Sequence, residues 1–312
     1  MAKAKENEGR VVVSKQKPAS YIIFDVLIYV FFGLFTLLCA YPFYYLIINS
    51  ISANDISARG EVLWYPTGVH FKNYVAVTQL NGLLRAAWIS VARTVLGTTG
   101  TCLGCSFMGF MFTQEKMWHR KFWYRFVVAT MYFSAGLIPH YITMKTLGLT
   151  NTFWIYVVPA IVQPYNIILI KTYIENTPKE LQEAAEVDGA GILTVFVRIM
   201  LPLIKPIMAT IAIFAAVGQW NAFQDTLIYV TDAKLHTLQF TLYQYINQAQ
   251  SLAKMVEANN GDLSVIGNLA TQQTATSVRM TVAVVVVLPV LFVYPIFQRF
   301  FVKGIMIGAV KG

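Results

Sequence analysis

Residues 177–202 read TPKELQEAAEVDGAGILTVFVRIMLP and lie between two long apolar stretches of the chain. The segment holds four acidic residues, although only 12% of all residues are charged. The two flanking stretches are long enough and apolar enough to span lipid. An acidic segment would be unstable there, because charged groups are costly to bury in lipid. The segment therefore indicates a water-facing element with a task of its own.

The first half of this segment has the pattern of a short capped helix. Thr177 suits the N-cap, Pro178 the first helical position, and Glu180 the third, which together predict a capping box. Glu183 also lies near the positive end of the helix dipole. Gly189 follows as the expected left-handed terminator, so we predict a helix that ends there.

The second half, ILTVFVRIM, predicts another short helix before Pro202 and Pro206. In the first helix Leu181, Ala184, Ala185 and Asp188 fall on adjacent faces at three- and four-residue spacing. The small Ala face would let another protein approach closely. On these residues alone an ordinary amphipathic cytoplasmic loop is the alternative, and both interpretations stay open.

The chain around this loop has the composition of a membrane protein. Of its 312 residues 56% are hydrophobic, and the charged share is about half of the roughly 25% that soluble domains carry. Lipid offers no water to backbone groups, so apolar runs of about 20 residues predict helices. We expect an all-α polytopic protein with six transmembrane helices near residues 22–49, 84–113, 122–144, 151–173, 205–230 and 280–301.

The distribution of Lys and Arg predicts the orientation. Sixteen lie on the N-terminal tail, the loops after spans two and four, and the C-terminal end, against seven on the opposite set. Positive-inside logic places both termini and residues 177–202 in the cytoplasm. We expect a tail at 1–20, a permease domain at 21–302, a tail at 303–312, and outer segments at 50–83 and 231–279. Short amphipathic helices are expected in 231–279, and no cleaved signal peptide is expected.

The net charge of +9 does not indicate nucleic-acid binding, because the basic residues flank apolar spans. The cysteines favour packing inside spans over redox or metal chemistry, even where Cys102 and Cys105 form C-x-x-C. The four histidines are isolated, and no G-x-S-x-G or H-E-x-x-H accompanies them. We therefore expect no catalytic residue and no bound metal.

Polar residues at depth within the spans are candidates for a substrate path. Trp220 beside Asn221 suits a sugar, which is held by stacking and hydrogen bonds, and an Arg facing a pore would suit an acidic sugar. The alternative is that such side chains bond neighbouring helices. The candidate set is Arg93, Tyr165, Asn166, Gln219, Trp220, Asn221, Gln224 and Asp225.

The opening segment resembles the cytoplasmic loop of binding-protein-dependent ABC importers, whose pattern is E-A-A, three residues, Gly, nine residues, I-x-L-P. Glu183 starts this pattern and Pro202 ends it at the same spacing. In that family the loop forms coupling helices that enter a cleft on the ATP-hydrolysing subunit. The resemblance implies an ATPase-coupling set of Glu180, Glu183, Ala184, Ala185, Asp188, Gly189, Ile199, Leu201 and Pro202.

The wider chain is similar to maltose-type carbohydrate permeases, in the branch associated with polysaccharides and lipoproteins. The stretches GLIPHYITMKTLGLTNTFW, GQWNAF and YPIFQRFFVKGIMIGAVKG carry this similarity. In such importers one permease's C-terminal tail reaches the ATPase dimer. The resemblance therefore implies that Lys303, Gly304 and Lys311 do the same.

The resemblance implies a type I importer permease for oligosaccharides or polysaccharide fragments in the bacterial cytoplasmic membrane. The expected partners are a second homologous permease, two cytoplasmic ABC ATPases, a solute-binding protein outside, and membrane lipid. The chain has no G-x-x-x-x-G-K-[ST], so ATP and Mg²⁺ are expected on the ATPases and no cofactor on this chain. Permeation of a non-sugar solute and a self-sufficient secondary transporter are the alternatives, the latter disfavoured by the lack of a visible internal repeat.

Overall fold

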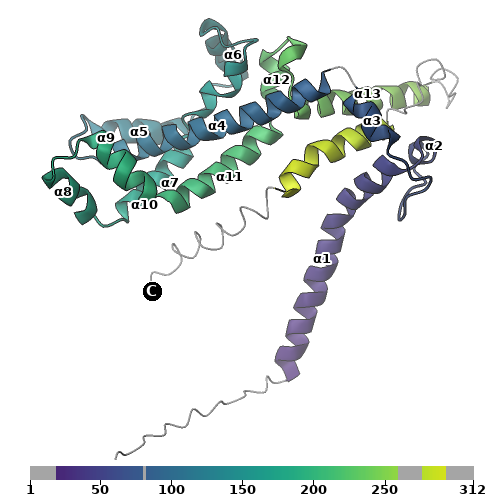
Figure 1. The fold of residues 1–312 in the computed structure, drawn as a ribbon, viewed down its shortest axis with the longest axis horizontal. Helices are drawn as coiled ribbons and strands as arrows, with labels where there is room; N and C mark the ends of the chain where they lie inside the picture. Colours follow the sequence, from purple (N-terminus) through teal and green to yellow (C-terminus); the bar gives the residue numbers. More distant parts are fainter. Residues whose placement is uncertain (1–18, 80–81, 259–275, 293–312) are drawn as a thin grey trace, which may run out of the picture.

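The computed structural model describes residues 19–79, 82–258 and 276–292, and these form helices joined by irregular segments. The longest interior helix, α4 (Leu83–Met111), packs along α11 (Lys205–Asn221) and α7 (Pro164–Glu175). Figure 1 shows α8 (Glu180–Val187) near one end of α4 and α13 (Leu238–Ala258) near the other. The loop predicted to be cytoplasmic and a segment predicted to be outside thus lie at opposite ends of one helix.

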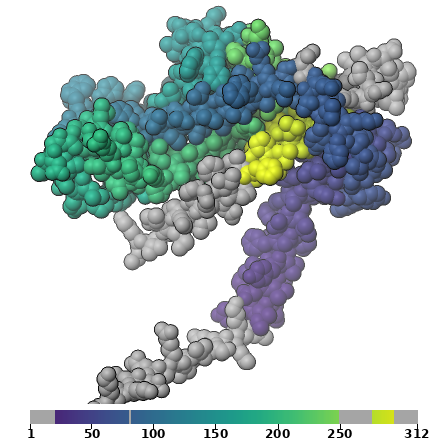
Figure 2. All heavy atoms as spheres, viewed as in Figure 1, coloured from purple at the N-terminus to yellow at the C-terminus, as the bar shows by residue number. Residues whose placement is uncertain are grey.

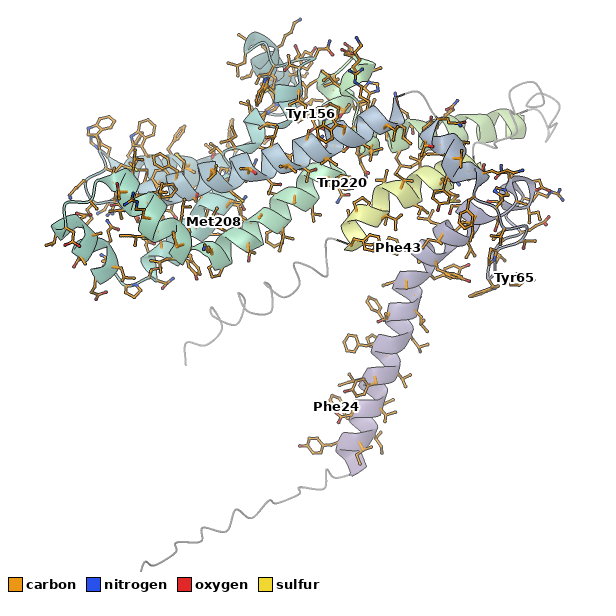
Figure 3. The ribbon with its side chains drawn as sticks, in the orientation of Figure 1. Phe24, Phe43, Tyr65, Tyr156, Met208 and Trp220 are labelled. Carbon is orange, nitrogen blue, oxygen red and sulfur yellow. The ribbon has the colours of Figure 1, made fainter. Side chains whose placement is uncertain are left out.

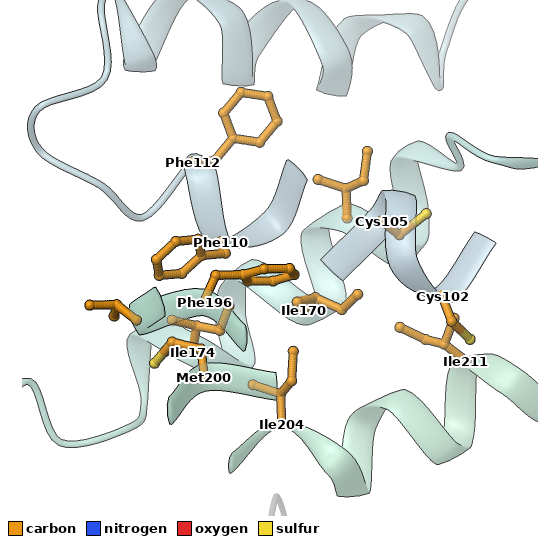
Figure 4. Packing of buried hydrophobic residues seen from close by; sticks show 12 residues of the cluster. Cys102, Cys105, Phe110, Phe112, Ile170, Ile174, Phe196, Met200, Ile204 and Ile211 are labelled. Atoms are coloured by element: carbon orange, nitrogen blue, oxygen red, sulfur yellow. The ribbon is translucent and has the colours of Figure 1, made fainter. Parts of the chain in front are cut away.

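Gly100 and Gly104 form a G-x-x-x-G, which is typical of closely packed membrane helices, and glycines do bring α4 close to its neighbours. A Cβ added at Gly104 would stand 2.7 Å from the carbonyl oxygen of Ile161, and one at Gly109 would stand 2.9 Å from Ile170. Beside this contact lies the largest group of buried apolar side chains, drawn in Figure 4. It joins α4, α7 and the end of the opening loop into one core.

The fourth predicted span is broken. It consists of η1 (Phe153–Tyr156), η2 (Val158–Ala160) and α7, with a bend of 41° between Phe153–Ala160 and α7. Side chains of α4 bond the backbone freed by this break. The Thr101 hydroxyl donates to the carbonyl of Ala160 at 2.8 Å.

Cys105 also bonds backbone groups at this break. Its thiol contacts the Ile161 carbonyl at 3.4 Å, and the backbone N–H of Gln163 donates to its sulfur at 3.4 Å. Buried backbone groups without partners are costly, so these bonds make the break tolerable inside the protein. Cys102 and Cys105 are both free and buried, which agrees with a packing role.

The fifth predicted span is interrupted as well. The helix α11 ends at Asn221, and α12 (Gln224–Tyr229) begins after a two-residue break. Before α11 the chain bends by 80° between Ile192–Leu203 and Lys205–Asn221. Pro206 has no N–H for a bond across this corner, which explains why the helix cannot continue.

The described residues do not contain six uninterrupted membrane-spanning helices. One helix, Tyr21–Ile51, has the length and composition to cross a membrane alone, and the number rises to three if each bent pair counts as one span. The third predicted span is divided into α5 (Arg120–Thr130) and α6 (Leu137–Thr146). Gly136, Pro139, Pro159 and Pro164 predict kinked or interrupted helices in the third and fourth spans, whereas no Gly or Pro stands at the break after Asn221.

The helix α1 (Ala19–Ile51) runs through Pro42 and leaves the other helices (Figures 1 and 2). In the most apolar 18-residue stretch of this helix no residue is buried by the rest of the chain. Figure 3 shows Phe24 on the projecting part and Phe43 where α1 meets the helix Thr276–Phe292. Most of α1 therefore has to be covered by lipid or by another protein.

The segment after α1 is folded by side-chain bonds to its backbone. It contains α2 (Asn54–Ala58) and α3 (Lys72–Thr78). The amide of the fully buried Asn49 donates to the carbonyl of Val62 at 3.1 Å and accepts from the Ser57 hydroxyl at 2.8 Å. These bonds give the segment between α1 and α3 a defined fold.

The long segment between the fifth and sixth predicted spans begins with η4 (Ala233–Leu235) and continues as α13. One helix of 21 residues thus replaces the short helices that we expected. In its first half Leu238, Leu242, Tyr245 and Ile246 recur at the three- and four-residue spacing of a helix with one apolar face. The remainder, 259–275, lies outside the described residues.

Candidate functional site

The helix α8 opens the candidate coupling site. The residue before it is Lys179, whose carbonyl accepts the first intrahelical N–H bonds. The Thr177 hydroxyl donates instead to the carbonyl of Tyr173 at 3.1 Å, in the last turn of α7. The predicted capping box was therefore wrong. Thr177 serves the helix that ends before it, and α8 begins at Glu180 without a side-chain cap.

The predicted end of α8 is confirmed. Gly189 has a φ of +81°, and its N–H donates to the carbonyl of Glu186. The N–H of Ala190 donates to the carbonyl of Ala185. This pair of bonds is the Schellman motif, which requires a left-handed residue at the glycine position.

The two faces of α8 have different surroundings. Ala185 packs against the core, whereas Ala184 is exposed, so the predicted small Ala face is divided between an inner and an outer side. Val187 is 87% exposed and Leu181 is also exposed. The outer side continues through Leu193 and Val197 on the following segment. The acidic residues and the terminal glycine of the motif are exposed too, namely Glu180, Glu183, Asp188 and Gly189.

The second half of the loop is α9 (Ile192–Thr194), a π-helical turn η3 (Val195–Met200) and α10 (Leu201–Leu203). Ile199 and Leu201 pack against the core, and Pro202 is exposed. A π-turn widens the helix by one residue per turn and is often found where function constrains the backbone. The apolar end of the motif thus anchors the loop, while its acidic start faces outward.

Two residues outside the motif hold α8 in place. The Gln182 amide donates to Oε1 of Gln114 at 2.7 Å, and the Gln114 amide lies 3.4 Å from Oε1 of Gln182. Lys116 Nζ lies 2.8 Å from Glu186 Oε2. The sequence offered one sign of this, a Gln and a Lys directly after a predicted span, but not their partners.

Hydrogen bonds from Gln182 and Lys116, together with the charge of Lys116, lower the pKa of the Glu186 carboxyl. A carboxyl with a lowered folded-state pKa adds stability above its unfolded pKa and loses it as the pH falls through the folded pKa. The Lys116–Glu186 pair is therefore intact at neutral pH and weakens only in acid. Its contribution is small because the Lys116 side chain is 84% exposed and the Glu186 carboxyl also reaches water.

Of the path candidates, Arg93 has the most definite surroundings. It is 2% exposed on α4, and its guanidinium forms a pair with Asp225. Nε and Nη2 both donate to Gln219 Oε1 at 3.0 Å, and Nη1 donates to the Ala222 carbonyl at 3.2 Å. Nη1 and Nη2 also donate to the two carboxylate oxygens of Asp225. All five donors of the guanidinium are thereby used.

The same group ties the break after α11 to the rest of the molecule. Gln219 donates to the Tyr156 carbonyl at 3.1 Å, and the Arg93 guanidinium lies 4.4 Å from the centre of the Tyr156 ring. The Tyr156 hydroxyl contacts Thr226 and donates to the carbonyl of Leu235. These bonds favour the structural alternative for Arg93, Gln219 and Asp225, since the charges of Arg93 and Asp225 are paired and Gln219 bonds both Arg93 and the Tyr156 backbone.

The remaining candidates are not brought together. Trp220 donates its indole N–H to the carbonyl of Val286 at 3.0 Å, so its position reflects helix packing. Asn166 is buried on α7. Asn221, Gln224 and Tyr165 are exposed and available to a ligand or a neighbouring subunit.

Sequence reasoning missed the exposed aromatic residues at the break between α5 and α6. Tyr132 is 86% exposed and Phe133 is 78% exposed, on backbone that is not helical. Nearby, the His140 ring and the Tyr229 hydroxyl lie 2.6 Å apart, and Tyr141 stacks on Tyr229. The GLIP at 136–139 predicts the break itself but not which side chains the break exposes.

Within the described ranges no three His, Cys, Asp or Glu side chains lie close enough to hold a metal ion. The predicted tail contacts, Lys303, Gly304 and Lys311, lie outside the described residues. They stay a prediction.

Comparison with known proteins connects this geometry to transport. Residues 11–307 match the family model described as "binding-protein-dependent transport system inner membrane component". The chain is 32% identical over 290 residues to the polygalacturonan/rhamnogalacturonan transport system permease protein YtcP of Bacillus subtilis, covering 93% of this chain and 99% of that protein. It is 34% identical to protein LplC of the same organism, covering 93% and 95% of the two chains.

A solved structure extends the similarity to the fold. A chain of a bacterial ABC transporter involved in the import of the acidic polysaccharide alginate superposes with a TM-score of 0.80. The identity is 26%, and the match covers 91% of this chain and 98% of the other. The helical architecture described above is therefore that of an ABC importer subunit.

Proposed function

This chain belongs to the family of binding-protein-dependent transport system inner membrane components, and we propose that it is the pore-forming permease subunit of an ATP-driven oligosaccharide importer. One observation carries the proposal. The motif residues Glu183 to Gly189 form an exposed helix, ended by a Schellman turn, at one extremity of the molecule. Exposed Val187 and Leu181 give this helix an apolar face that water alone would not favour.

The partner at this face is an ATP-hydrolysing subunit. The apolar outer side of α8 would enter its cleft, and the exposed acids Glu180, Glu183 and Asp188 would meet basic groups around it. Two ATPases that close on ATP would push the two coupling helices of the transporter together. ATP and Mg²⁺ belong to those subunits, and this chain contributes docking and transmission.

A second permease completes the pore. Alternating access requires two halves that move against one another, and this chain resembles one half. The exposed apolar length of α1 and the exposed break at 131–136 support this partner. Non-helical backbone at membrane depth is tolerated only against protein or a water-filled cavity. We place this break in the subunit interface or the path.

Six membrane crossings with both termini in the cytoplasm fit this assembly. In this arrangement α5 and α6 form one interrupted crossing, and η1, η2 and α7 another. The C-terminal tail, with Lys303 and Lys311, would reach the ATPase dimer. A solute-binding protein would dock on the opposite side, against 50–83 and α13.

The substrate is an oligosaccharide or a polysaccharide fragment. Relatives named for polygalacturonan, rhamnogalacturonan and alginate support an acidic sugar chain as the first one to test. Arg93 would not select it, because its donors are fully occupied. A non-sugar solute is the alternative, and uptake that continued without the ATPases would instead indicate a secondary transporter.

Replacing Gly189 by valine is expected to lower ATPase association and uptake about tenfold or more. A β-branched residue with a left-handed φ costs about 1–2 kcal/mol, which is close to a tenfold change in binding. Glu183→Lys should act in the same direction by reversing the charge of the outer face. Co-purification of the ATPase and ATP-dependent uptake in proteoliposomes measure both.

Gly191→Ala is the matched control for this experiment. Gly191 has a φ of −70° and no neighbour within 4 Å of an added Cβ, so association should be unchanged. If Gly189→Val and Glu183→Lys both kept full association and uptake, α8 would not be the docking element.

Asn221→Ala and Gln224→Ala are expected to lower oligosaccharide uptake severalfold while the complex stays assembled. Both side chains are exposed beside the break after α11 and have polar atoms for sugar hydroxyls. Uptake of labelled acidic and neutral oligosaccharides would be compared with that of Thr146→Ala, an exposed residue on α6 whose hydroxyl bonds only its own helix. Trp220→Ala should differ from both by reducing assembly, because the indole bonds Val286. Unchanged uptake would remove Asn221 and Gln224 from the path.

A further inference from the structure

The attachment of α8 to the membrane helices depends on two pairs of side chains. Gln182 and Gln114 face each other with their amides, with the shorter bond at 2.7 Å. Lys116 and Glu186 form an ion pair one turn further along α8. Gln114 and Lys116 belong to the short connection that directly follows α4, 68 and 70 residues before their partners.

The two pairs differ in how firmly they hold. Gln114 is 7% exposed, so losing Gln182 would leave its buried amide oxygen without this donor, while its amide nitrogen keeps a contact with Thr113 Oγ1 at 3.3 Å. The Lys116 side chain is 84% exposed, and an ion pair in water contributes little. Gln182 also donates to Oε1 of Glu186 at 3.0 Å, which links the two pairs. The amide pair is therefore the fixed point, and the ion pair is a weaker contact beside it.

Open space lies on both sides of these contacts. A cavity of about 320 Å³ is lined by Thr177, Lys179 and Glu183, among others. A second cavity of about 260 Å³ is lined by Gly189 and Ile192, among others. Both cavities share the four side chains of the two pairs. Both spaces are pockets open to the surface, and α8 is held between them, with one pocket toward its first turn and the other toward its glycine end.

We propose that the Gln114–Gln182 pair is the pivot on which the coupling helix α8 turns relative to α4, and that Lys116–Glu186 sets its resting angle. This inference rests on the proposed function of α8. A fixed point between two cavities lets the helix rock, because close packing would otherwise resist rotation. Gln114 is therefore a positioning residue, which transmits the displacement of α8 to α4 without contacting ATP or sugar.

The consequence is a direct mechanical route. The connection from 112 to 119 continues α4, and α4 carries the side chains that hold both broken spans, such as Arg93 and Cys105. A turn of α8 about Gln114 would move the end of the helix on which those breaks depend. Loss of the pivot should leave α8 able to dock but unable to pass its motion on.

The test uses the complete transporter, both permeases with their ATPases and binding protein, in lipid nanodiscs for ATP hydrolysis and in proteoliposomes for uptake. Gln114→Ala and Gln182→Ala are made singly and together. We expect ATPase co-purification to stay within twofold of the unmodified complex, and sugar transported per ATP hydrolysed to fall about tenfold. The double variant should be no worse than either single one, because both remove the same contact.

The exposed ion pair provides a second variant that does not depend on a buried residue. Lys116→Glu should shift the basal ATPase rate, and adding Glu186→Lys should restore it, since the pair is then re-formed with reversed charges. Glu175→Gln is the matched control. Glu175 lies near the first cavity but pairs with Lys171 on its own helix, so its loss should have no effect.

The outcomes separate the two ideas. Unchanged transport per ATP in the Gln114 and Gln182 variants would overturn the pivot, and so would loss of ATPase binding in them, which would make these residues part of the docking surface. If the unmodified complex did not retain an ATPase at all, the proposed function itself would fail. Restoration by the charge swap, with coupling lost in the amide variants, would support the pivot.

Discussion

Arg93→Ala is expected to abolish assembly of the transporter, with a loss of about 3–5 kcal/mol in the stability of this chain. The substitution leaves the Asp225 carboxylate, the Gln219 amide oxygen and the Ala222 carbonyl without their common donor. Removing one partner of a buried ion pair destabilises a protein more than replacing both partners by apolar residues, because an uncompensated charge remains. Thermal unfolding of the purified complex, followed by size-exclusion profile, measures the loss.

Two further variants separate structure from substrate recognition. Arg85→Ala removes an exposed arginine from the same helix and should leave the unfolding temperature unchanged. Arg93→Met with Asp225→Leu removes both charges and should recover part of the stability. If Arg93→Ala were fully stable but lost uptake of acidic sugars alone, Arg93 would be a substrate ligand and its network would be incidental.

Gly104→Val is expected to have the second largest effect and to prevent α4 from packing on the broken span. Even the first added carbon would lie 2.6 Å from the Ile161 side chain and 2.7 Å from its carbonyl oxygen. The carbonyl is backbone and cannot rotate away, so α4 must shift and lose the bonds from Cys105 and Thr101. Overpacking of this kind costs about 1–3 kcal/mol, and the lost bonds add to it.

Gly100→Ala is the comparison on the same face of α4. Its added carbon meets side chains and no backbone, with Ile161 Cγ1 at 3.3 Å and Val157 Cγ1 at 3.9 Å, so a shift of a few tenths of an ångström makes room for it. The yield of folded permease and its unfolding temperature should therefore stay near those of the unmodified chain. Equal behaviour of the Gly100 and Gly104 variants would show that the close approach at Ile161 is not required.

The parts of the site that could be predicted from sequence are those set by local chemistry. Gly189 had to be left-handed because a helix ended there, and the structure gives it a φ of +81°. The spacing from Glu183 to Pro202 was enough to indicate the family, which the comparisons confirm. The capping box failed for a local reason too. Thr177 had two helices within reach and bonded the one before it.

The parts that could not be predicted depend on residues far apart in the chain. Arg93 and Asp225 were each candidates at depth, but their pairing across 132 residues cannot be read from spacing. Gln114 looked like an ordinary loop residue until Gln182 was placed against it. The breaks at 136–139 and near Pro159 and Pro164 could be expected from Gly and Pro, whereas the break after Asn221 has no such residue and depends on hydrogen bonds that tertiary contacts supply.

The helix α4 also constrains the order in which the protein can be built. It leaves the ribosome before the two broken spans that its side chains satisfy, so the Thr101 hydroxyl and Cys105 thiol are already present when Ala160 and Ile161 need them. Arg93 is in the opposite position, because its carboxylate partner is synthesised 132 residues later. An unpaired arginine at mid-membrane costs about 2.5–3.5 kcal/mol even on the most lenient scale. Burying Arg93 without its carboxylate is costly in the same way, so the contact that ties α4 to the break after α11 forms only after α12 has been synthesised.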